Sequence, residues 1–393
     1  MKKSLVVVAL AGAMAFTAAS AETVLYGSIR LGAEVQKNHF SYDEATKVAK
    51  LNKRGLEMSD FGSRLGLKGS EDLGNGTKVI YQLEWGFDGM AGDANGEGFH
   101  NRLAYIGLTG DWGTVALGRQ NNPFTESLNA GTIADEFNGN YTSALRLATV
   151  AAFAKPGAEA EMTVDAKAMP TRVGNSIAYV SPSFSGFSFT VAGIAKAPEL
   201  DDENVTGVYP DGQNLYNEAN NKSKGFDIYT VGLNYEHESG FYAKAAYLGT
   251  DMYKNAKRGN AYGLNVGFAN EQFGVNADFG GAERGRKNGA DNKQAKISSK
   301  GWDVGAQFSF GPDYFSTVRA TVGQSTTNYK YEEGKNKDKM TVWALGFEQK
   351  LSTRTKVWAE FAKQDRKVKF HNVKTEDQKR HNDVFSLGIR HDF

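Results

Sequence analysis

The chain has 393 residues, enough for two or three soluble domains, and it contains no cysteine, so no disulfide can stabilise it. Its 46 Lys and Arg residues nearly balance 45 Asp and Glu residues, which argues against the bulk positive charge of a nucleic-acid-binding protein. There are 45 Gly but only 7 Pro residues, a composition that suits strands and tight turns rather than disorder.

The first element in chain order, residues 1–21, has the pattern of a secretory signal peptide. Two lysines follow Met1, Leu5 to Phe16 form an apolar run, and small residues up to Ala21 provide a cleavage site. The apolar run is too short for a transmembrane anchor. We therefore expect an exported protein whose mature domain comprises residues 22–393, in which no later apolar run predicts a transmembrane helix.

The mature sequence consists of short segments in which apolar and polar side chains alternate, as they do in β-strands with one apolar face. In the first segment, Leu25 and Ile29 share one face, while Arg30 and Glu34 share the other. Turn-forming residues such as those from Glu71 to Gly76 separate neighbouring segments. We predict sixteen strands, at residues 23–35, 63–70, 77–87, 101–109, 114–119, 172–180, 187–195, 227–235, 241–247, 262–268, 273–279, 302–310, 315–323, 341–349, 356–362 and 383–393.

Short turns alternate with longer polar segments along the whole chain, as expected for strands that run up and down in antiparallel order. An even number of strands places both termini at the short-turn end. The predicted long loops are residues 36–57, 89–98, 121–170, 197–224, 252–259, 282–298, 329–338 and 369–381.

This pattern predicts an all-β fold, a 16-stranded antiparallel transmembrane β-barrel. A soluble β-sandwich also alternates, but sixteen strands with charged mid-strand faces would leave a large apolar area without a partner. A barrel with its apolar face toward lipid accommodates both faces, and closure pairs every strand edge. Aromatic residues that fit the girdles of such barrels lie near strand ends, at Trp85, Trp112, Trp302, Tyr314, Trp343 and Phe393.

The loop at residues 121–170 is exceptional, because connections of roughly fifty residues are usually functional or disordered. It carries three acids within a short stretch, Glu126, Asp135 and Glu136. We predict that this constriction loop folds into the barrel and narrows its lumen. Its part from Ala148 to Met169, Ala-rich and then acidic, has no assignment.

Several stretches of the mature chain share specific motifs. They read TVLYGSIRLGAEV at 23–35, FGSRLGLKGSEDLGNGTKVIYQLEWGF at 61–87, NRLAYIGLTGDWGTVALGRQNNPF at 101–124, NSIAYVSPSFSGFSF at 175–189 and SLGIRHDF at 386–393. Together they resemble the general porins of Gram-negative outer membranes, of the neisserial and related β-proteobacterial type. The chain departs from that pattern mainly inside the constriction loop, where residues 148–169 look longer than in the family.

The resemblance implies a homotrimer in the outer membrane, with one pore per subunit and a third extracellular loop folded into the lumen. It also implies passive diffusion of ions and small hydrophilic solutes, and contact with outer-membrane lipid and lipopolysaccharide. Nucleic acid is not expected as a partner. The alternating C-terminal residues look like the signal read by the barrel-assembly machinery: Phe385, Leu387, Ile389, His391 and Phe393.

Strand phase also predicts which side chains point into the lumen: Arg30, Glu34, Arg64, Lys68, Lys78, Glu84, Arg102, Arg172, Lys244, Asp278, Arg319 and Glu360. Arg119 ends the strand that enters the constriction loop. From the family, Arg64, Arg102 and Arg172 are expected at the narrowest part, facing the acidic loop. We therefore predict six pore-lining basic residues, Arg30, Arg64, Lys68, Arg102, Arg119 and Arg172.

Arginines on the wall and carboxylates on the loop would create a transverse electric field, because charges between low-dielectric surfaces are screened less than in bulk water. Arginine suits this wall because it stays charged at all relevant pH values. The basic excess favours a weak anion preference, which the loop acids oppose. The alternative is that these arginines only solvate the lumen.

An enzyme is not expected. The sequence has no G-x-S-x-G or H-E-x-x-H motif and no thiol, and its six histidines lie mostly in loops or near strand ends. We predict no catalytic residue, no cofactor and no metal site. The residues leave two other functions open, a channel specific for one solute and a barrel used for adhesion or host interaction.

Overall fold

The computed structural model describes residues 22–43, 48–91, 98–139, 141, 143–153, 169–195, 225–251, 257–285, 294–331, 334–369 and 378–393. The predicted signal peptide, residues 1–21, lies outside the described residues, as does most of the unassigned segment at 148–169.

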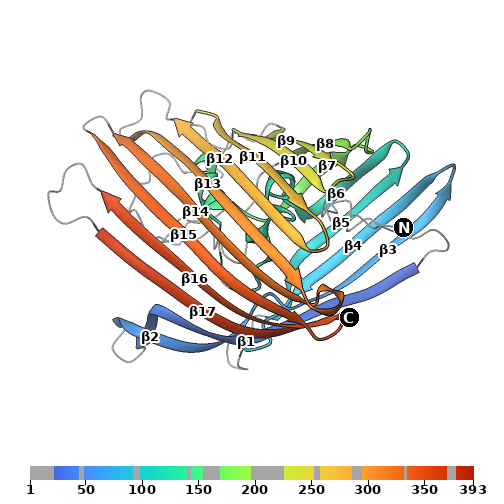
Figure 1. The fold of residues 1–393 in the computed structure, drawn as a ribbon. Helices are drawn as coiled ribbons and strands as arrows, with labels where there is room; N and C mark the ends of the chain where they lie inside the picture. Colours follow the sequence, from blue (N-terminus) through green and yellow to red (C-terminus); the bar gives the residue numbers. More distant parts are fainter. Residues whose placement is uncertain are drawn as a thin grey trace.

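The chain forms one closed antiparallel sheet around a lumen (Figure 1). Each strand pairs with the next along the chain, and the last strand pairs back with the first, so that Arg30 lies opposite Arg390. The strands are β1 (Glu22–Asp43), β2 (Val48–Asp60), β3 (Arg64–Gly74), β4 (Thr77–Gly86), β5 (His100–Gly110), β6 (Gly113–Asn121), β7 (Arg172–Val180), β8 (Phe187–Ala195), β9 (Phe226–Glu236), β10 (Phe241–Thr250), β11 (Gly259–Ala269), β12 (Phe273–Gly285), β13 (Gln294–Phe310), β14 (Ser316–Tyr331), β15 (Lys335–Lys350), β16 (Thr355–Lys369) and β17 (Gln378–Asp392).

The 17 strands occupy 16 positions in the wall, because β2 and β3 both pair with β1 along the same edge. Between them the chain breaks its strand pairing at Phe61 to Ser63, where Gly62 takes a φ of 89° that favours glycine. The predicted 16-stranded antiparallel barrel is therefore confirmed.

The strands are longer than the sequence pattern predicts at the long-loop end. The predicted loop at 36–57 is wrong, because β1 continues to Asp43 and β2 begins at Val48. The loops predicted at 282–298, 329–338 and 369–381 are likewise shortened by β12 to β17. Beyond the lipid, side chains on the outer face no longer need to be apolar, so strand pairing continues where the alternation in hydropathy has ended.

Exposure alternates along the strands as the barrel requires. On β15 the exposed residues include Trp343, Leu345 and Phe347, whereas Val342 and Ala344 between them are buried. Five of the residues predicted for the aromatic girdles are exposed: Trp112, Trp302, Tyr314, Trp343 and Phe393. The apolar outer face of the barrel is the one that lipid would contact.

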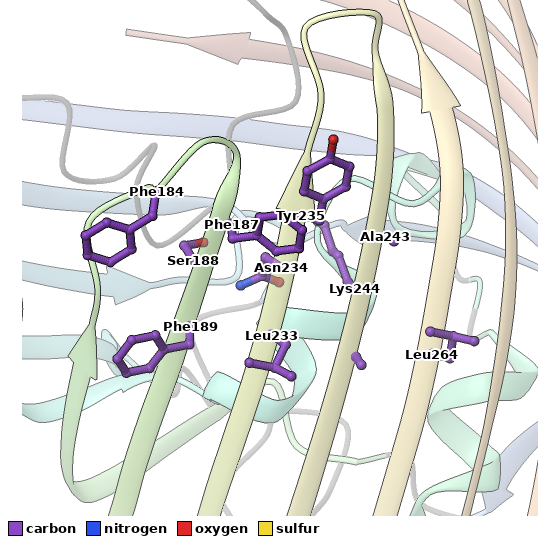
Figure 2. Close-up of a pocket in the computed structure, with 11 residues that line it drawn as sticks. Phe184, Phe187, Ser188, Phe189, Leu233, Asn234, Tyr235, Ala243, Lys244 and Leu264 are labelled. Atoms are coloured by element: carbon purple, nitrogen blue, oxygen red, sulfur yellow. The ribbon is translucent and has the colours of Figure 1, made fainter.

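The outer face also contains a shallow apolar groove of about 310 Å³ across β8 to β11 (Figure 2). Its lining includes the small side chains of Ala243 and Ala245 together with Phe187, Leu233 and Leu264. The neighbouring Lys244 is 1% exposed and faces the lumen side of the same strand.

Within the barrel, the described part of the constriction loop contains four short helices: α2 (Pro123–Asn129), η1 (Ile133–Glu136), α3 (Ala144–Ala148) and η2 (Val150–Phe153). The Asn122 side chain accepts a hydrogen bond from Phe124 N at 3.1 Å, and Pro123 occupies the first turn of α2. Ser143 caps α3 in the same way through Arg146 N. Local sequence therefore fixes where these helices begin.

An apolar layer joins the constriction loop to the lumen side of the wall. Phe124, Leu128 and Leu145 of the loop belong to one buried cluster with wall residues such as Ile228 and Leu248. Burial of each large apolar side chain contributes about 1.5–3 kcal/mol. The described part of the loop is thus packed against the wall as a protein core would be, and Figure 1 shows these helices inside the barrel.

Glycines on the lumen side of the wall let the loop approach the sheet closely. A Cβ added at Gly263 would lie 2.5 Å from Leu128 Cδ1, and one added at Gly280 would lie 2.5 Å from Leu145 Cδ1. At Gly305 the added Cβ would lie 2.6 Å from Cβ of Ile133. The loop therefore rests on positions that have no side chain.

The described residues include no helix that is both long and apolar enough to cross a membrane.

Candidate functional site

Polar side chains of the wall hold the backbone of the constriction loop. Lys244 Nζ donates to Ala130 O at 2.7 Å, and Asn265 Nδ2 donates to Leu128 O at 2.9 Å. The Asp303 carboxylate accepts from the backbone N–H groups at the start of α3, with Oδ1 3.2 Å from Ala144 N and Oδ2 2.5 Å from Leu145 N. These bonds satisfy backbone groups at helix ends that would otherwise lack partners.

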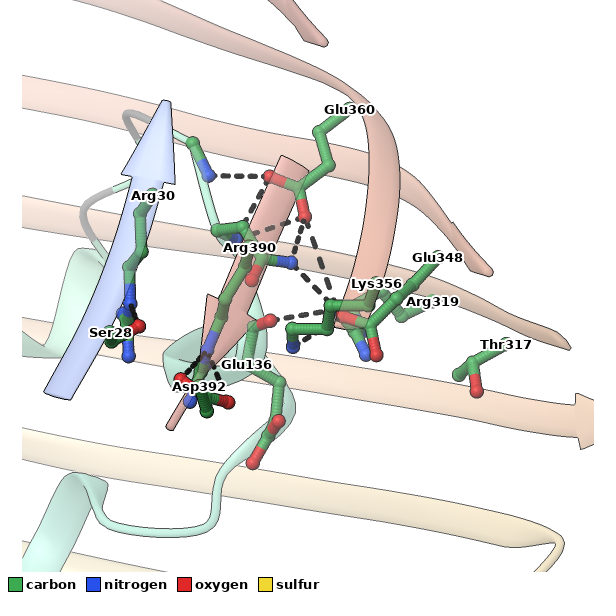
Figure 3. Close-up of polar contacts among 12 residues, drawn as sticks. Ser28, Arg30, Glu136, Thr317, Arg319, Glu348, Lys356, Glu360, Arg390 and Asp392 are labelled. Carbon is green, nitrogen blue, oxygen red and sulfur yellow. Dashed lines mark hydrogen bonds and ion pairs between the residues drawn. The ribbon is translucent and has the colours of Figure 1, made fainter. Parts of the chain in front are cut away.

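The tip of the loop is attached to the wall at a second place, which we call the tip anchor. It consists of Glu360 and Arg319 on the wall and Glu136, Asn138 and Gly139 on the loop. Glu360 accepts from Asn138 N at 3.0 Å and from Gly139 N at 2.7 Å, and Arg319 donates to the backbone oxygen of Glu136 at 2.7 Å (Figure 3). Both wall side chains are 4% exposed, so the anchor is largely shielded from water.

Next to the tip anchor, basic side chains from adjacent strands form what we call the basic row (Figure 3). In the register of the sheet, Arg390 lies opposite both Arg30 and Lys356, so three cations stand side by side on β1, β17 and β16. Arg64 and Arg102 are close enough to Arg30 to interact with it electrostatically. The members of the basic row are Arg102, Arg64, Arg30, Arg390, Lys356 and Arg319.

Acids between the cations neutralise part of this charge. Glu84 lies between two arginines, with Oε1 2.7 Å from Arg102 Nε and Oε2 3.6 Å from Arg64 Nε. Glu348 accepts from Lys356 Nζ at 2.8 Å, and Asp392 accepts from Arg390 Nε at 2.8 Å (Figure 3). With Glu360, these acids are fewer than the cations, so the row keeps a positive excess.

A chain of hydrogen bonds fixes Glu84 in place. Tyr105 OH donates to Gln82 Oε1 at 2.7 Å, Gln82 Nε2 donates to Tyr26 OH at 2.5 Å, and Tyr26 OH donates to Glu84 Oε2 at 3.0 Å. Lys68 Nζ lies 5.4 Å from the centre of the Tyr26 ring. Because these hydrogen bonds fix the Glu84 carboxylate, they also fix the guanidinium groups of Arg64 and Arg102 that pair with it.

The predicted pore-lining residues divide into two groups. Arg30, Arg64 and Arg102 meet in the basic row. Arg119 donates instead to Asn101 O at 3.2 Å, at the end of β6. Arg172 begins β7 opposite Asn121 and is 9% exposed, at the foot of the constriction loop. A pore-lining role for all six of these basic residues stays a prediction.

The three predicted loop acids have different surroundings. Glu136 is exposed, and its backbone takes part in the tip anchor. The Asp135 side chain is accessible from the lumen but has protein around it. The resulting loss of hydration, together with the charge of Glu136, raises the pKa of Asp135 to about 6. Burial and the charge of Asp135 raise the pKa of Glu126 to about 7, and the charge of Lys244 opposes that shift.

Sequence reasoning missed several residues of the site. Lys356, Arg390, Glu348 and Asp392 lie in the basic row but were not among the predicted lumen residues. The alternation of these strands places them on the lumen face. Lys356 lies on the same face of β16 as Glu360, which was predicted to face the lumen, and Arg390 lies on the same face of β17 as the buried Ser386. The signal was therefore present in the alternation of β15, β16 and β17.

The C-terminal strand closes the barrel. Phe385, Leu387 and Ile389 are exposed on its outer face. The last residue, Phe393, exchanges two backbone hydrogen bonds with Gly27 of β1, at 3.0 and 3.1 Å. His391 Nδ1 lies 2.9 Å from the Thr355 hydroxyl. Reading of these residues by an assembly machinery stays a prediction.

Within the part of the chain that is described, no three His, Asp or Glu residues are grouped so that they could hold a metal ion.

A closed barrel with an apolar outer face, a charged lumen and a loop packed inside defines the class of transmembrane β-barrels with a constricted lumen. The chain belongs to the Gram-negative porin family, whose model matches residues 5–369. Family, fold and location in the outer membrane are thus as predicted, and the family is one of channels rather than of enzymes.

Two curated relatives are neisserial. The chain is 34% identical over 246 residues to the major outer membrane protein P.IB of Neisseria gonorrhoeae, covering 63% of this chain but only 56% of that protein. It is 30% identical over 321 residues to the major outer membrane protein P.IA of Neisseria meningitidis serogroup A, covering 72% and 73% of the two chains. The match thus spans little more than half of the P.IB protein.

Among solved structures, the anion-selective porin from Comamonas acidovorans superposes with a TM-score of 0.66 at 19% identity, covering 95% of this chain and 100% of that one. At this identity the likeness concerns the fold alone.

Proposed function

We propose that this protein is a porin that forms a water-filled channel in the outer membrane for passive diffusion of ions and small hydrophilic solutes. The observation that carries the proposal is the basic row, which lies on the lumen wall of a barrel whose constriction loop is packed on β8 to β15. Such a lumen presents charged side chains to a solute that diffuses through it. The trimeric assembly implied by the sequence resemblance is part of this proposal.

The proposed selectivity is a weak preference for anions. Cations of the basic row exceed the acids paired with them, and low-dielectric surfaces around narrow water strengthen their field. The carboxylates of Asp135 and Glu136 oppose this preference from the loop. The two effects partly cancel, so the preference should be small and dependent on salt concentration.

Planar-bilayer recording tests the proposal. A general porin gives large, ohmic single-channel conductance that rises in proportion to the KCl concentration, and a KCl gradient gives a reversal potential of anionic sign. Saturation of the current, or block by one solute, would support the alternative of a solute-specific channel. Absence of conductance by the folded barrel would favour the adhesion or host-interaction alternative and reject the porin proposal.

We expect the anion preference to increase when the pH is lowered from about 8 to about 5. The raised pKa values of about 7 for Glu126 and about 6 for Asp135 mean that both carboxylates are charged above this window and neutral below it. The loop therefore loses negative charge while the arginines of the basic row stay protonated. Reversal potentials in a fixed KCl gradient measure the change.

Asp135→Asn provides the control for this pH effect. Because the Asp135 side chain is open to the lumen, its replacement should make the selectivity at neutral pH resemble that of the unmodified channel at low pH. The pH dependence that remains should be that of Glu126 alone and therefore smaller than in the unmodified channel. An unchanged pH profile in the Asp135→Asn channel would contradict the assignment.

For biogenesis, we propose export by a cleaved signal peptide at residues 1–21 and insertion through the barrel-assembly machinery, guided by Phe385, Leu387, Ile389, His391 and Phe393. Two observations support this: the outward-facing apolar residues of β17, and the closure of the barrel between Phe393 and Gly27.

Deletion of Phe393 is expected to lower the amount of folded protein in the outer membrane several-fold, because both the terminal aromatic and its two backbone bonds to Gly27 are lost. Quantification of the heat-modifiable barrel in outer-membrane fractions measures this. Phe241→Ala is the matched control, because Phe241 is exposed to a similar degree, 44% against 43%. Equal losses in both variants would mean that the terminal position has no special role.

A further inference from the structure

Four Asn–Gly pairs occur in the sequence, and one of them, Asn138–Gly139, lies in the tip anchor. An asparagine followed by glycine deamidates more readily than an asparagine followed by a larger residue. The backbone nitrogen of the glycine attacks the side-chain carbonyl carbon of the asparagine, and the absence of a Cβ on glycine leaves room for the ring that forms. The tip of the constriction loop therefore carries a pair of residues that can react with each other without an enzyme.

The reaction needs water as its only co-reactant. The Gly139 nitrogen loses its proton and forms a bond to Cγ of Asn138, and ammonia leaves from the same carbon. Water then opens the resulting succinimide ring at one of its two carbonyl groups. The product is aspartate or isoaspartate at position 138, so a neutral amide becomes a carboxylate.

In the docked tip, the hydrogen bonds of both residues oppose this reaction. Gly139 N donates to Glu360 Oε2 at 2.7 Å, so the attacking nitrogen keeps its hydrogen beside an anion, where loss of the proton is disfavoured. Asn138 Nδ2 donates to Glu348 Oε2 and to Glu360 Oε1, both at 3.1 Å. These two bonds hold the side-chain amide against the wall and restrict its rotation toward Gly139 N. Asn138 is thus protected while the tip is docked.

The wall also accounts for the presence of this dipeptide. A Cβ at position 139 would collide with Ser386 Oγ of β17 and would lie 3.1 Å from Glu360 Oε2, so the docked tip favours glycine there. Glu348 and Glu360 are 5% and 4% exposed, and both accept hydrogen bonds from the uncharged amide of Asn138. Docking against two acids therefore favours Asn–Gly, although the dipeptide is chemically unstable when it is free.

Deamidation reverses the interaction of position 138 with the wall. The carboxylate replaces an amide nitrogen that lies 3.1 Å from an oxygen of each of two carboxylates. Like charges at such a distance repel strongly where little water screens them. The neighbouring cations, Arg319 and Lys356, already pair with Glu348 and Glu360, and they would then face three acids. A deamidated tip is therefore disfavoured from docking again.

We propose that Asn138 is a spontaneous deamidation site that reacts only when the tip of the constriction loop is detached, and that the reaction then keeps the tip detached. Loop motions are much faster than deamidation, so the reaction rate is proportional to the fraction of time that the tip spends away from the wall. Because the reaction is irreversible, one event alters a channel permanently. The inference rests on the geometry of the tip anchor and does not depend on conduction.

Peptide mapping by mass spectrometry tests this inference on the folded full barrel, incubated in mildly alkaline heavy-oxygen water. A deamidated peptide then carries the heavy oxygen. The internal reference is Asn75–Gly76, which is exposed in the turn between β3 and β4. We expect Asn138 to deamidate about tenfold or more slowly than Asn75 in the unmodified protein, because only the detached tip can react.

Glu360→Ala is expected to accelerate deamidation of Asn138 about tenfold or more, since the backbone N–H groups of Asn138 and Gly139 both donate to this carboxylate. Glu360→Gln keeps one acceptor oxygen and should give an intermediate rate. Glu238→Ala, which removes an exposed carboxylate from a short turn, is the matched control and should leave the rate unchanged. Heat-modifiability confirms that each variant is folded. An unchanged rate in Glu360→Ala, or equal rates at Asn138 and Asn75 in the unmodified protein, would overturn the inference.

Asn138→Asp reproduces the charge of the product and tests its effect on the loop. Its open-channel current should be noisier than that of the unmodified channel. Addition of Glu360→Gln returns a hydrogen-bond donor to the anchor and should make the current quieter again. Quiet currents in Asn138→Asp alone would contradict the lasting release of the tip. Peptide masses are measured without any current, so a barrel that does not conduct would reject the porin proposal and leave the deamidation result unaffected.

Discussion

The double variant Arg64→Glu with Arg102→Glu is expected to change the channel from weakly anion-selective to cation-selective. Both guanidinium groups lie in the basic row and pair with Glu84. Reversing them replaces two cations with two anions and also leaves the charge of Glu84 without its partners. A unit charge about 4 Å away in water contributes about 1 kcal/mol to the energy of a passing ion. The ratio of anion to cation permeability should therefore fall about tenfold or more at low salt.

Reversal potentials in KCl gradients measure this change, and it should be larger near 0.1 M than near 1 M salt, where the Debye length is only about 3 Å. Arg258→Glu with Lys350→Glu is the matched control, because it gives the same change in net charge at exposed positions. Heat-modifiability confirms that each variant folds. Arg64→Gln with Arg102→Gln should give an intermediate result. If the control moves the reversal potential as far as the lumen variant, the basic row does not set selectivity.

Replacing Glu360 with Ala is expected to release the tip of the constriction loop. Glu360 accepts hydrogen bonds from Asn138 N, Asn138 Nδ2 and Gly139 N, and it is 4% exposed. A hydrogen bond to a charged group contributes about 1.5–3 kcal/mol. Loss of about 2 kcal/mol of anchoring would increase the detached fraction of the tip about thirtyfold. The direct readout is current noise in the open channel, which should increase.

Two comparisons make this experiment specific. Glu360→Gln keeps one acceptor oxygen and should give noise between that of the unmodified and the Glu360→Ala channels. Glu238→Ala removes a carboxylate from an exposed short turn and should change nothing. The apolar layer and the Asp303 bonds still hold the rest of the loop, so the barrel should stay folded. Quiet, unaltered currents in Glu360→Ala would mean that the tip anchor does not restrain the loop.

Strand alternation was sufficient to predict the wall of this protein. The lipid-facing side chains of each strand must be apolar, so the barrel, its strand number and residues such as Arg30, Arg64 and Arg102 followed from the sequence. The same rule would have identified Lys356 and Arg390. The rule failed at the ends of the long strands. Beyond the lipid both faces of a strand are in water, so apolar and polar side chains no longer alternate.

The interior arrangement could not be predicted from alternation. A rule that makes lumen positions polar says nothing of Ile228 and Leu248, which face inward but are covered by the constriction loop. The rule also does not predict that the three loop acids have different surroundings. Glu126 packs beside Lys244, whereas Glu136 stays exposed near Arg319, and this difference depends on how the loop folds back on the wall. Long-range docking of one segment has no periodic signature in sequence.

The glycines beneath the constriction loop have a consequence for how the pore width is encoded. Leu128, Ile133 and Leu145 rest on Gly263, Gly305 and Gly280, so the distance between loop and sheet is set by residues without side chains. A methyl group at Gly305 would meet Cβ of Ile133 and push the loop toward the middle of the lumen, whereas at Gly263 and Gly280 it would first meet the flexible end of a leucine side chain. Substitutions in the wall beneath the loop can therefore change the width of the pore. Relatives can then differ in permeability although the residues that contact the solute are identical.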